Sequence, residues 1–186
     1  MSLRDYYNTA VNAGGISSTS TFWRGQSFTA GSSYNFASIK VQLRRFATGP
    51  GTVTLELYSD DGTGKPTGPL LASGTTNGDT LPLTVPGEWR EITFGAAYPV
   101  VNGTKYVFYL KATSGSVQIR FDFQLSTYAG GDQVSSFDSG ASWAVDTTSD
   151  FLFENYDDFA FTPPVDIHTV KRLIAISNEK LWYEDV

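Results

Sequence analysis

The sequence predicts an all-β protein folded as an antiparallel β-sandwich of the jelly-roll type, and three observations support this prediction. Short segments in which apolar and polar residues alternate recur between residues 22 and 156, as half-buried strands require. The stretches between them are rich in Gly, Thr, Ser and Asp, which favour turns. The same region has no amphipathic helical pattern longer than two turns.

The composition agrees with one well-buried domain. The chain has 186 residues, which is enough for a single domain and a tail but short for two ordinary domains. Hydrophobic residues make up 40% and aromatic residues 15%, so we expect a folded core rich in rings. Charged residues reach only 17%, and 18 glycines are available for turns, which is typical of β-proteins.

The alternating segments define the expected strands in order. In the segment 36–46, Ile39, Val41 and Leu43 alternate with polar residues, which gives the strand one apolar face. The segment 53–58 repeats this pattern after a Gly/Pro turn, so we expect the two segments to form a hairpin. The full set of expected strands is 22–29, 36–46, 53–58, 70–75, 89–94, 106–110, 117–124, 142–146 and 150–156.

Two of these segments have a predicted place in the fold. Residues 106–110 are apolar on both faces, so this strand should lie centrally with both sides covered. Residues 150–156 should form the closing strand. The loop 59–69 is too rich in Gly and Pro to continue a strand.

The pattern divides the chain into three parts. Residues 1–21 are polar and Gly-rich and are expected to form an extended N-terminal arm, and residues 22–162 form the jelly-roll domain. Residues 163–186, which begin at a Pro-Pro pair, form a tail. We expect this tail to be a β-hairpin that docks on the domain, a neighbouring subunit or a partner protein, with a helix over 168–182 as the alternative.

Charge and hydropathy argue against two kinds of partner. The net charge is −6, whereas binding a nucleic acid needs clustered Lys and Arg, and no cluster exceeds the pairs Arg44-Arg45 and Lys171-Arg172. No apolar run approaches the roughly 20 residues that span a membrane. The first residues lack the apolar core of a signal peptide. Taking Met1 as the natural start, we expect synthesis in a cytoplasm and a location in a virion, or outside the cell after release.

Several motifs together resemble a known kind of domain. A Gln-Ser-Phe-Thr strand at residues 26–29 opens it, and an Asp-Gly-Thr-Gly-Lys-Pro-Thr-Gly loop at 61–68 precedes Leu-Ala-Ser-Gly at 71–74. The set resembles the jelly-roll modules of phage structural proteins and bacterial surface proteins, over about residues 22–156. Such modules are similar in fold to carbohydrate-binding modules, so the resemblance implies the fold more strongly than a function.

Residue types for catalysis are scarce. The chain has no cysteine, and its one histidine, His168, follows the Pro-Pro pair in the tail. An acid pair for glycoside hydrolysis could come from the glutamates on the expected strands, but outward Glu on an alternating strand is normally a solubilising residue. We therefore predict no catalytic residue. The glutamates considered are Glu56, Glu88, Glu91 and Glu154.

A structural calcium ion is an open alternative, although no cofactor is required. Asp60 and Asp61 could supply two carboxylates in one turn, and calcium takes six to eight oxygens. The competing interpretation is that Asp-Gly makes the turn by hydrogen-bonding its own backbone. A second acidic group flanks the closing strand and consists of Asp146, Asp150, Asp157 and Asp158.

Aromatic side chains are the best clue to a ligand. Sugars stack on flat Tyr and Trp faces, and four such residues occupy outward strand positions or turns. The competing interpretation is that a sandwich this rich in aromatics uses several in its core and at its edges. The predicted ligand-binding residues are Trp89, Tyr109, Tyr128 and Trp143, with Trp23 as a candidate to join them.

Three functional hypotheses follow. The first is a non-enzymatic structural or binding module of a virion, such as a phage tail, fibre or decoration protein, that contacts virion or self subunits through its arm and tail and could attach to a glycan. The second is a carbohydrate-binding module of a secreted or cell-surface protein. The third is a small polysaccharide-degrading enzyme.

Overall fold

The computed structural model of the chain describes residues 1–123 and 127–158. Within these residues it is nearly all β, with one short 3-10 turn, η1 (Gly78–Thr80). The strands are β1 (Leu3–Tyr7), β2 (Ala13–Ser18), β3 (Trp23–Thr29), β4 (Tyr34–Arg45), β5 (Thr52–Asp60), β6 (Pro66–Asn77), β7 (Glu88–Val100), β8 (Lys105–Ala112), β9 (Val117–Asp122), β10 (Gln133–Ser136), β11 (Ala144–Asp146), β12 (Asp150–Phe151) and β13 (Phe153–Asp157).

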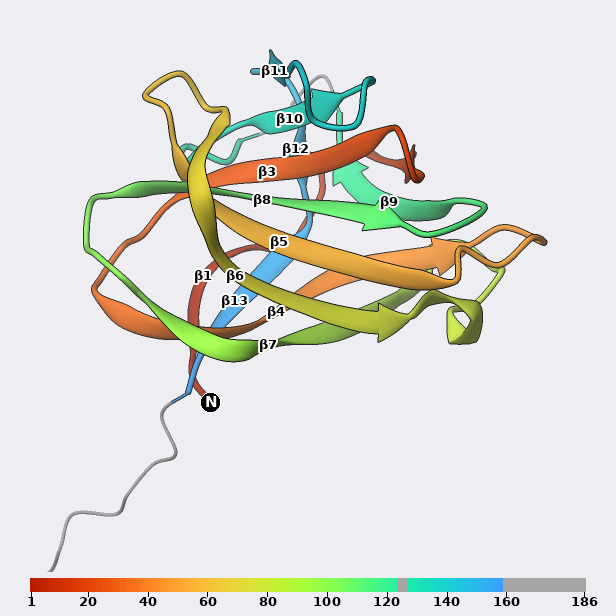
Figure 1. Ribbon diagram of the computed structural model, residues 1–186, viewed down its shortest axis with the longest axis horizontal. Helices are drawn as coiled ribbons and strands as arrows, with labels where there is room; N and C mark the ends of the chain where they lie inside the picture. The colour runs from red at the N-terminus through yellow and green to blue at the C-terminus, as the bar shows by residue number, and fades with distance from the viewer. Residues whose placement is uncertain (124–126, 159–186) are drawn as a thin grey trace, which may run out of the picture.

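The strands form one curled antiparallel sheet (Figure 1). Along the sheet the order is β1-β13-β4-β7-β6-β5-β8-β3-β10-β11, and β9 pairs with β4, β2 and β12. We call β1, β13, β4, β7, β9, β2 and β12 the β4 half, and the other six strands the β8 half.

The strand register joins the two halves at one position of the described residues, where Gly74 of β6 pairs with Phe94 of β7. A Cβ atom at Gly74 would lie 2.3 Å from the carbonyl oxygen of Thr93 and 2.9 Å from Ile92 Cγ2. Glycine therefore permits the close approach of the two backbones at this point.

The core lies between the two halves and is filled by phenylalanine rings. Phe28 of β3 lies 5.6 Å from Phe36 of β4 and 6.2 Å from Phe153 of β13, measured between ring centres. Phe108 of β8 lies 5.5 Å from Phe153 in an edge-to-face arrangement. All four side chains are fully buried. Strands that share no hydrogen bonds are thus held together by ring packing.

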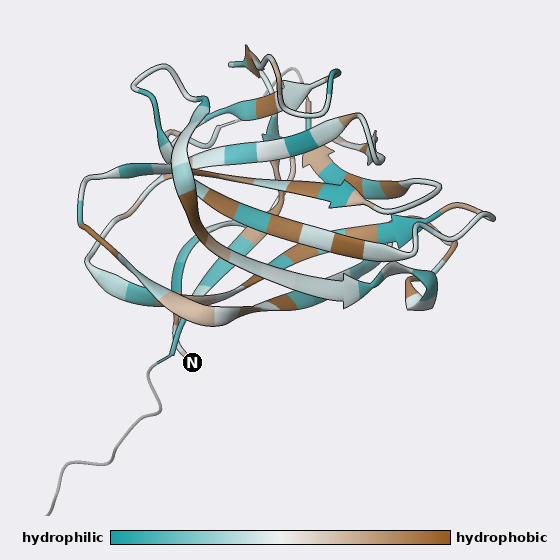
Figure 2. Cartoon of the chain, viewed as in Figure 1, coloured by the Kyte–Doolittle hydropathy of each residue, from teal (hydrophilic) through white to brown (hydrophobic). Residues whose placement is uncertain are grey.

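The alternating pattern of the sequence matches the burial of the strands. Along β5, Val53, Leu55 and Leu57 are fully buried and their neighbours are not, and the colours of Figure 2 alternate accordingly. Residues 106–110 of β8 are all buried, as predicted for a strand that is apolar on both faces. β8 lies between β3 and β5, so both of its edges are paired.

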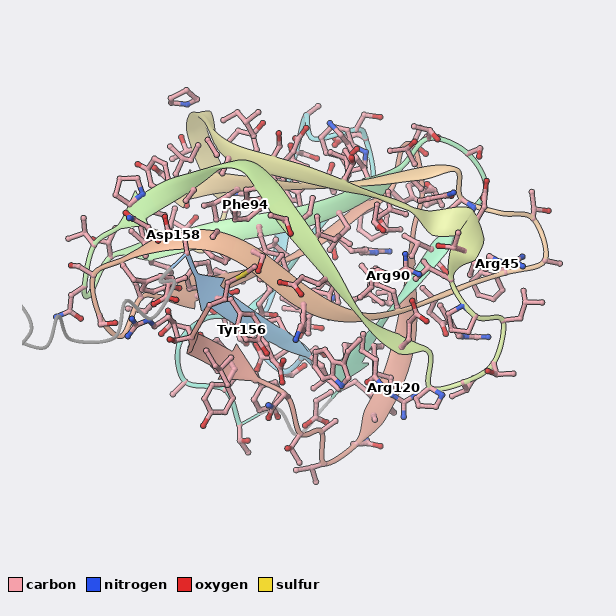
Figure 3. All side chains as sticks on the ribbon, turned by 90° about the horizontal axis from the view of Figure 1, so that it is seen from below. Arg45, Arg90, Phe94, Arg120, Tyr156 and Asp158 are labelled. Atoms are coloured by element: carbon pink, nitrogen blue, oxygen red, sulfur yellow. The ribbon has the colours of Figure 1, made fainter. Side chains whose placement is uncertain are left out.

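The end of the core is closed by η1 and the chain that follows it. Leu81 is 2% exposed, and the Arg45 Nε atom donates to its carbonyl oxygen at 2.9 Å. Arg90 of β7 donates from Nη1 to the hydroxyls of Thr76 and Thr80, each at 3.0 Å. Figure 3 shows Arg45 and Arg90 on the side of the molecule where η1 lies. These two arginines connect the β4 half to the end of the β8 half.

The prediction of an extended N-terminal arm is corrected by the structure, in which the first residues belong to the sheet. β1 pairs with β13, and β2 pairs with β9 over six residues. Buried carboxylates hold the segment: Asp157 binds Arg4, and Asp122 accepts from the Tyr7 hydroxyl and from the backbone N–H groups of Val11 and Asn12. The sequence pattern did not predict these strands because they are polar. Hydrogen bonds to buried carboxylates hold them in the sheet, and they lack the apolar alternation of the other strands.

The prediction that segments 36–46 and 53–58 form a hairpin is also wrong. β4 pairs with β7, β13 and β9, whereas β5 pairs with β6 and β8. The connection from Arg45 to Thr52 therefore crosses from one half of the sheet to the other. Period-two alternation predicts which face of a strand is buried, but it does not identify the neighbouring strand.

The other strand predictions are confirmed in their main features. The remaining expected segments fall on strands, although the last is divided into β12 and β13, and β6 begins at Pro66 inside the Gly/Pro-rich stretch. β1, β2 and β10 were not predicted. The tail 163–186 lies outside the described residues. In the described part of the chain, no helix has the length and apolar character needed to cross a membrane.

We expect the replacement Asp122→Asn to destabilise the fold by about 1–3 kcal/mol, because donors aimed at a buried carboxylate lose part of their acceptor. Burial favours a raised pKa for Asp122, but the hydrogen bonds from Tyr7, Val11 and Asn12 outweigh it and hold the pKa below its ordinary value. The stabilisation is therefore present above the pKa of the unfolded chain and is lost as pH falls. Urea unfolding at neutral and acidic pH measures it. Asp158→Asn, at an exposed position, is the control, and an equal effect of both replacements would contradict the assignment.

Candidate functional site

Three aromatic rings form a row on the outer face of the β8 half. Tyr109 of β8 lies opposite Gly25 of β3 and Glu56 of β5. Residues two apart on a strand share a face, so Trp23 and Tyr58 lie on the same side as Tyr109. The ring centres of Trp23 and Tyr109 are 5.1 Å apart with an interplanar angle of 14°, and those of Tyr58 and Tyr109 are 5.5 Å apart at 10°. The three rings are stacked side by side across three strands.

A charged pair lies beside this row. Glu56 accepts hydrogen bonds from the Tyr109 and Tyr58 hydroxyls, and its Oε1 atom is 2.7 Å from Lys111 Nζ. Lys111 Nζ also lies 4.8 Å from the centre of the Trp23 ring. Burial favours a raised pKa for Glu56, but the hydrogen bonds from Lys111 and Tyr109 outweigh it and lower the pKa. The carboxylate is therefore ionised at neutral pH.

Two loops rise around the row and enclose a hollow of about 350 Å³. One wall is the start of β6, at Pro66, Thr67 and Gly68, and the other is formed by Ser139, Gly140 and Trp143. The β5–β6 and β10–β11 connections stand on the same side of the β8 half in Figure 1. Together with the row and the charged pair, these residues define the aromatic hollow. Trp143 lies 5.0 Å from Tyr109, between ring centres.

The loop that carries Trp143 is fixed by its own backbone. Ser139 and Gly140 both have positive φ, 58° and 87°, and the Ala141 N–H donates to the Asp138 carbonyl, as in a type I′ turn. The Asp138 carboxylate accepts from the Ser142 N–H at 2.8 Å. A Cβ atom at Gly140 would lie 2.5 Å from the Trp23 ring, so a glycine is needed for the loop to rest on that ring.

The structure brings together two of the four predicted ligand-binding residues, Tyr109 and Trp143, and the candidate Trp23. Trp89 lies elsewhere, on β7 opposite Gln42, and is 37% exposed. Tyr128 is partly buried, with its ring 5.4 Å from that of Phe153 in the core.

Sequence reasoning missed the contributions of Tyr58 and Lys111. Tyr58 lies on β5, the strand beside Tyr109, so a correct pairing of β5 with β8 would have indicated it. Lys111 lies two residues after Tyr109 on β8 and therefore shares its face. The expected hairpin placed β5 beside β4 instead. The error in the strand neighbours thus concealed one of the three rings of the row, Tyr58.

The two aspartates considered for calcium, Asp60 and Asp61, make hydrogen bonds within their own turn. Asp61 Oδ1 accepts from the Thr63 N–H and hydroxyl and from the Lys65 N–H, and Asp60 Oδ1 accepts from the Gly62 N–H. These bonds build the turn, as the competing interpretation of the Asp-Gly sequence predicts. Among the described residues no three or more Asp, Glu or His side chains gather as a metal cluster. This also applies to the second acidic group, Asp146, Asp150, Asp157 and Asp158.

The glutamates considered for catalysis are dispersed as well. Of the described residues that line the aromatic hollow, Glu56 is the one acid. Glu88 binds Arg90 and Glu91 accepts from Ser38, both on the β4 half. Glu154 accepts from Asn8 and Tyr156. His168 lies outside the described residues.

A buried acid lies on the opposite, inner side of β3. Asp150 is 3% exposed, and its Oδ1 atom accepts from Gln26 Nε2 at 2.6 Å. Burial raises the pKa of Asp150 to about 7; the Gln26 hydrogen bond opposes this, and the nearby Asp132 and Asp122 add to it. The unfolded chain therefore releases this proton at lower pH than the folded chain does.

We expect this acid to make the protein less stable as pH rises from about 4 to about 7, because the unfolded state binds fewer protons in that window. Asp150→Asn stays neutral and should lack this loss. The free energy of unfolding of the unmodified protein should fall by roughly 1–3 kcal/mol relative to the variant, allowing for solvent screening. Urea titrations at about pH 5 and about pH 8 measure the difference. A constant difference would show that Asp150 is ionised throughout.

A scan against protein-family models and a search of the curated proteins each found no match for this chain. The resemblance to jelly-roll modules therefore stays an expectation from the sequence motifs.

Proposed function

We propose that this chain is a non-enzymatic binding module that holds a carbohydrate in the aromatic hollow. The observation that carries the proposal is the convergence of four rings from separate segments, Trp23, Tyr58, Tyr109 and Trp143, around the charged pair of Glu56 and Lys111. A saccharide presents apolar C–H faces and a rim of hydroxyls, so it needs both kinds of partner within one hollow.

The polar residues of the aromatic hollow suit hydroxyl groups. Glu56 offers an acceptor and Lys111 a donor, and both are already oriented by their mutual ion pair. Ser139 and Thr67 add hydroxyls on opposite walls. Because the turn at 138–141 fixes one wall, little ordering is needed when a ligand binds, which favours affinity.

The same geometry favours binding over hydrolysis. Glycoside hydrolysis normally uses two carboxyl groups roughly 5–10 Å apart, one of them protonated. Glu56 is the one acid among the described lining residues, and its lowered pKa keeps it ionised. It is therefore a poor general acid.

The proposal includes the jelly-roll sandwich as the finer description of the curled sheet. Two features support it. In the described strands one residue pair joins the β4 half to the β8 half, and rings from both halves fill the space between them. In this description the aromatic hollow lies on the outer face of one layer.

The assembly of this chain into a virion stays a prediction. The N-terminal segment that was expected to reach a neighbouring subunit pairs within its own chain, and the tail 163–186 lies outside the described residues. Carbohydrate binding and assembly are compatible, since attachment structures of virions can do both. Light scattering after size-exclusion chromatography measures the assembly state.

We expect Trp143→Ala to weaken saccharide binding at least tenfold, because it removes an aromatic wall of the hollow. A glycan array identifies a bound saccharide, and calorimetry with that saccharide measures the affinity. Trp89→Ala is the matched control, since Trp89 was predicted on equal grounds but lies outside the hollow.

Three outcomes would contradict the proposal: no saccharide bound by the unmodified protein, equal losses in the two tryptophan variants, or release of reducing ends from the bound saccharide that stops in Glu56→Gln. The last outcome would favour the hydrolytic alternative.

A further inference from the structure

A second hollow, of about 280 Å³, lies on the other side of β3 from Trp23. Arg24 and Ser135 are paired across β3 and β10, and Gln133 lies two residues from Ser135 on the same face. These three residues and Phe137 line the hollow, and Ile16 of β2 adds an apolar side chain. We call it the arginine hollow. It is separate from the aromatic hollow because consecutive residues of a strand point to opposite faces.

Arg24 is a buried cation with spare hydrogen-bond donors. It is 9% exposed, its Nε atom donates to the Ser17 carbonyl at 3.3 Å, and its guanidinium carbon lies 4.5 Å from the centre of the Phe137 ring. None of the ion pairs found in the described part of the chain involves Arg24. The two terminal nitrogens are thus left as a planar fork of donors, held in place by the carbonyl and the ring.

A buried acceptor is present in the same hollow. Gln133 is 3% exposed, and its Oε1 atom has no hydrogen-bond partner among the described residues. A buried polar atom without a partner destabilises a fold, and so does the burial of an uncompensated charge. Burial lowers the pKa of the Arg24 guanidinium, which shows the same desolvation. The donors of Arg24 would be satisfied by a ligand with an anionic oxygen pair.

We propose that the arginine hollow binds the carboxylate of an acidic sugar, such as a hexuronic acid. The planar fork of Arg24 matches a planar carboxylate. Phe137 and Ile16 face the apolar side of the ring.

A monoanion fits better than a phosphate or sulfate group, since Arg24 is the one cationic residue among the described lining residues and Asp146 also lines the hollow. The volume lies near the lower end of ligand sites, which suits a single sugar ring.

This inference goes beyond the proposed function and does not depend on it, because the two hollows lie on opposite faces of β3. The test uses methyl β-glucuronide as the probe, with methyl β-glucoside as its uncharged match and acetate as a bare carboxylate. Isothermal calorimetry on the full chain measures each affinity, and circular dichroism verifies the fold of every variant.

We expect the glucuronide to bind at least tenfold more tightly than the glucoside and acetate. Arg24→Gln should remove this preference, and Trp143→Ala, which alters only the aromatic hollow, should retain it. Phe137→Ala changes a side chain that is 58% exposed, so the fold should persist while the affinity for the glucuronide falls several-fold. This variant keeps the proposal testable if Arg24→Gln does not fold.

The proposal would be overturned if the glucuronide bound no better than the glucoside, or if acetate bound as tightly as the glucuronide. It would also be overturned if Phe137→Ala, or a folded Arg24→Gln, left the affinity unchanged. Loss of glucuronide binding in Trp143→Ala with no loss in Arg24→Gln would assign the sugar to the aromatic hollow instead.

Discussion

The packing of Phe28 against rings from both halves of the sheet is the interaction on which the rest of the structure depends. Phe28 contacts Phe36, Phe108 and Phe153, so one β3 side chain holds the β8 half against the β4 half. Strand pairing contributes little across this boundary, since Gly74 and Phe94 are the one pair of residues in the described strands that bridges it. Apolar burial, at about 25 cal/mol per Å², has to keep the halves together. The rings on the outer face of the β8 half are then free for other contacts.

β3 determines where both hollows lie. Its residues alternate between the two faces, so Trp23 contributes to the aromatic hollow and the adjacent Arg24 to the arginine hollow. The segment that follows β10 contributes to both as well, through Trp143 on one side and Phe137 on the other. Neither hollow requires a catalytic group. Each hollow combines one residue of β3, Trp23 or Arg24, with residues of the β10–β11 connection, which its own turn fixes.

The sequence predicted those features that depend on local pattern. Alternation identified most strands and the buried faces, and double-sided apolarity identified β8 as central. The sequence did not predict features that depend on strand neighbours, such as the pairing of β5 with β8, and therefore missed the place of Tyr58 beside Tyr109. The sequence alone did not distinguish Arg24 from an exposed arginine. The residues beside it in the fold, among them Ser135 and Phe137, lie far away along the chain. The N-terminal strands were missed because carboxylates such as Asp122 hold them.

The two halves of the sheet, which pair at Gly74, should unfold together. Since the two halves share the same ring-filled interior, neither can open without exposing apolar surface of the other. A stepwise loss of one half would leave the remaining strands with an uncovered face and no compensating contacts. The chain should therefore behave as a single cooperative unit in which amide protons of β4 and β8 exchange with solvent through the same global opening.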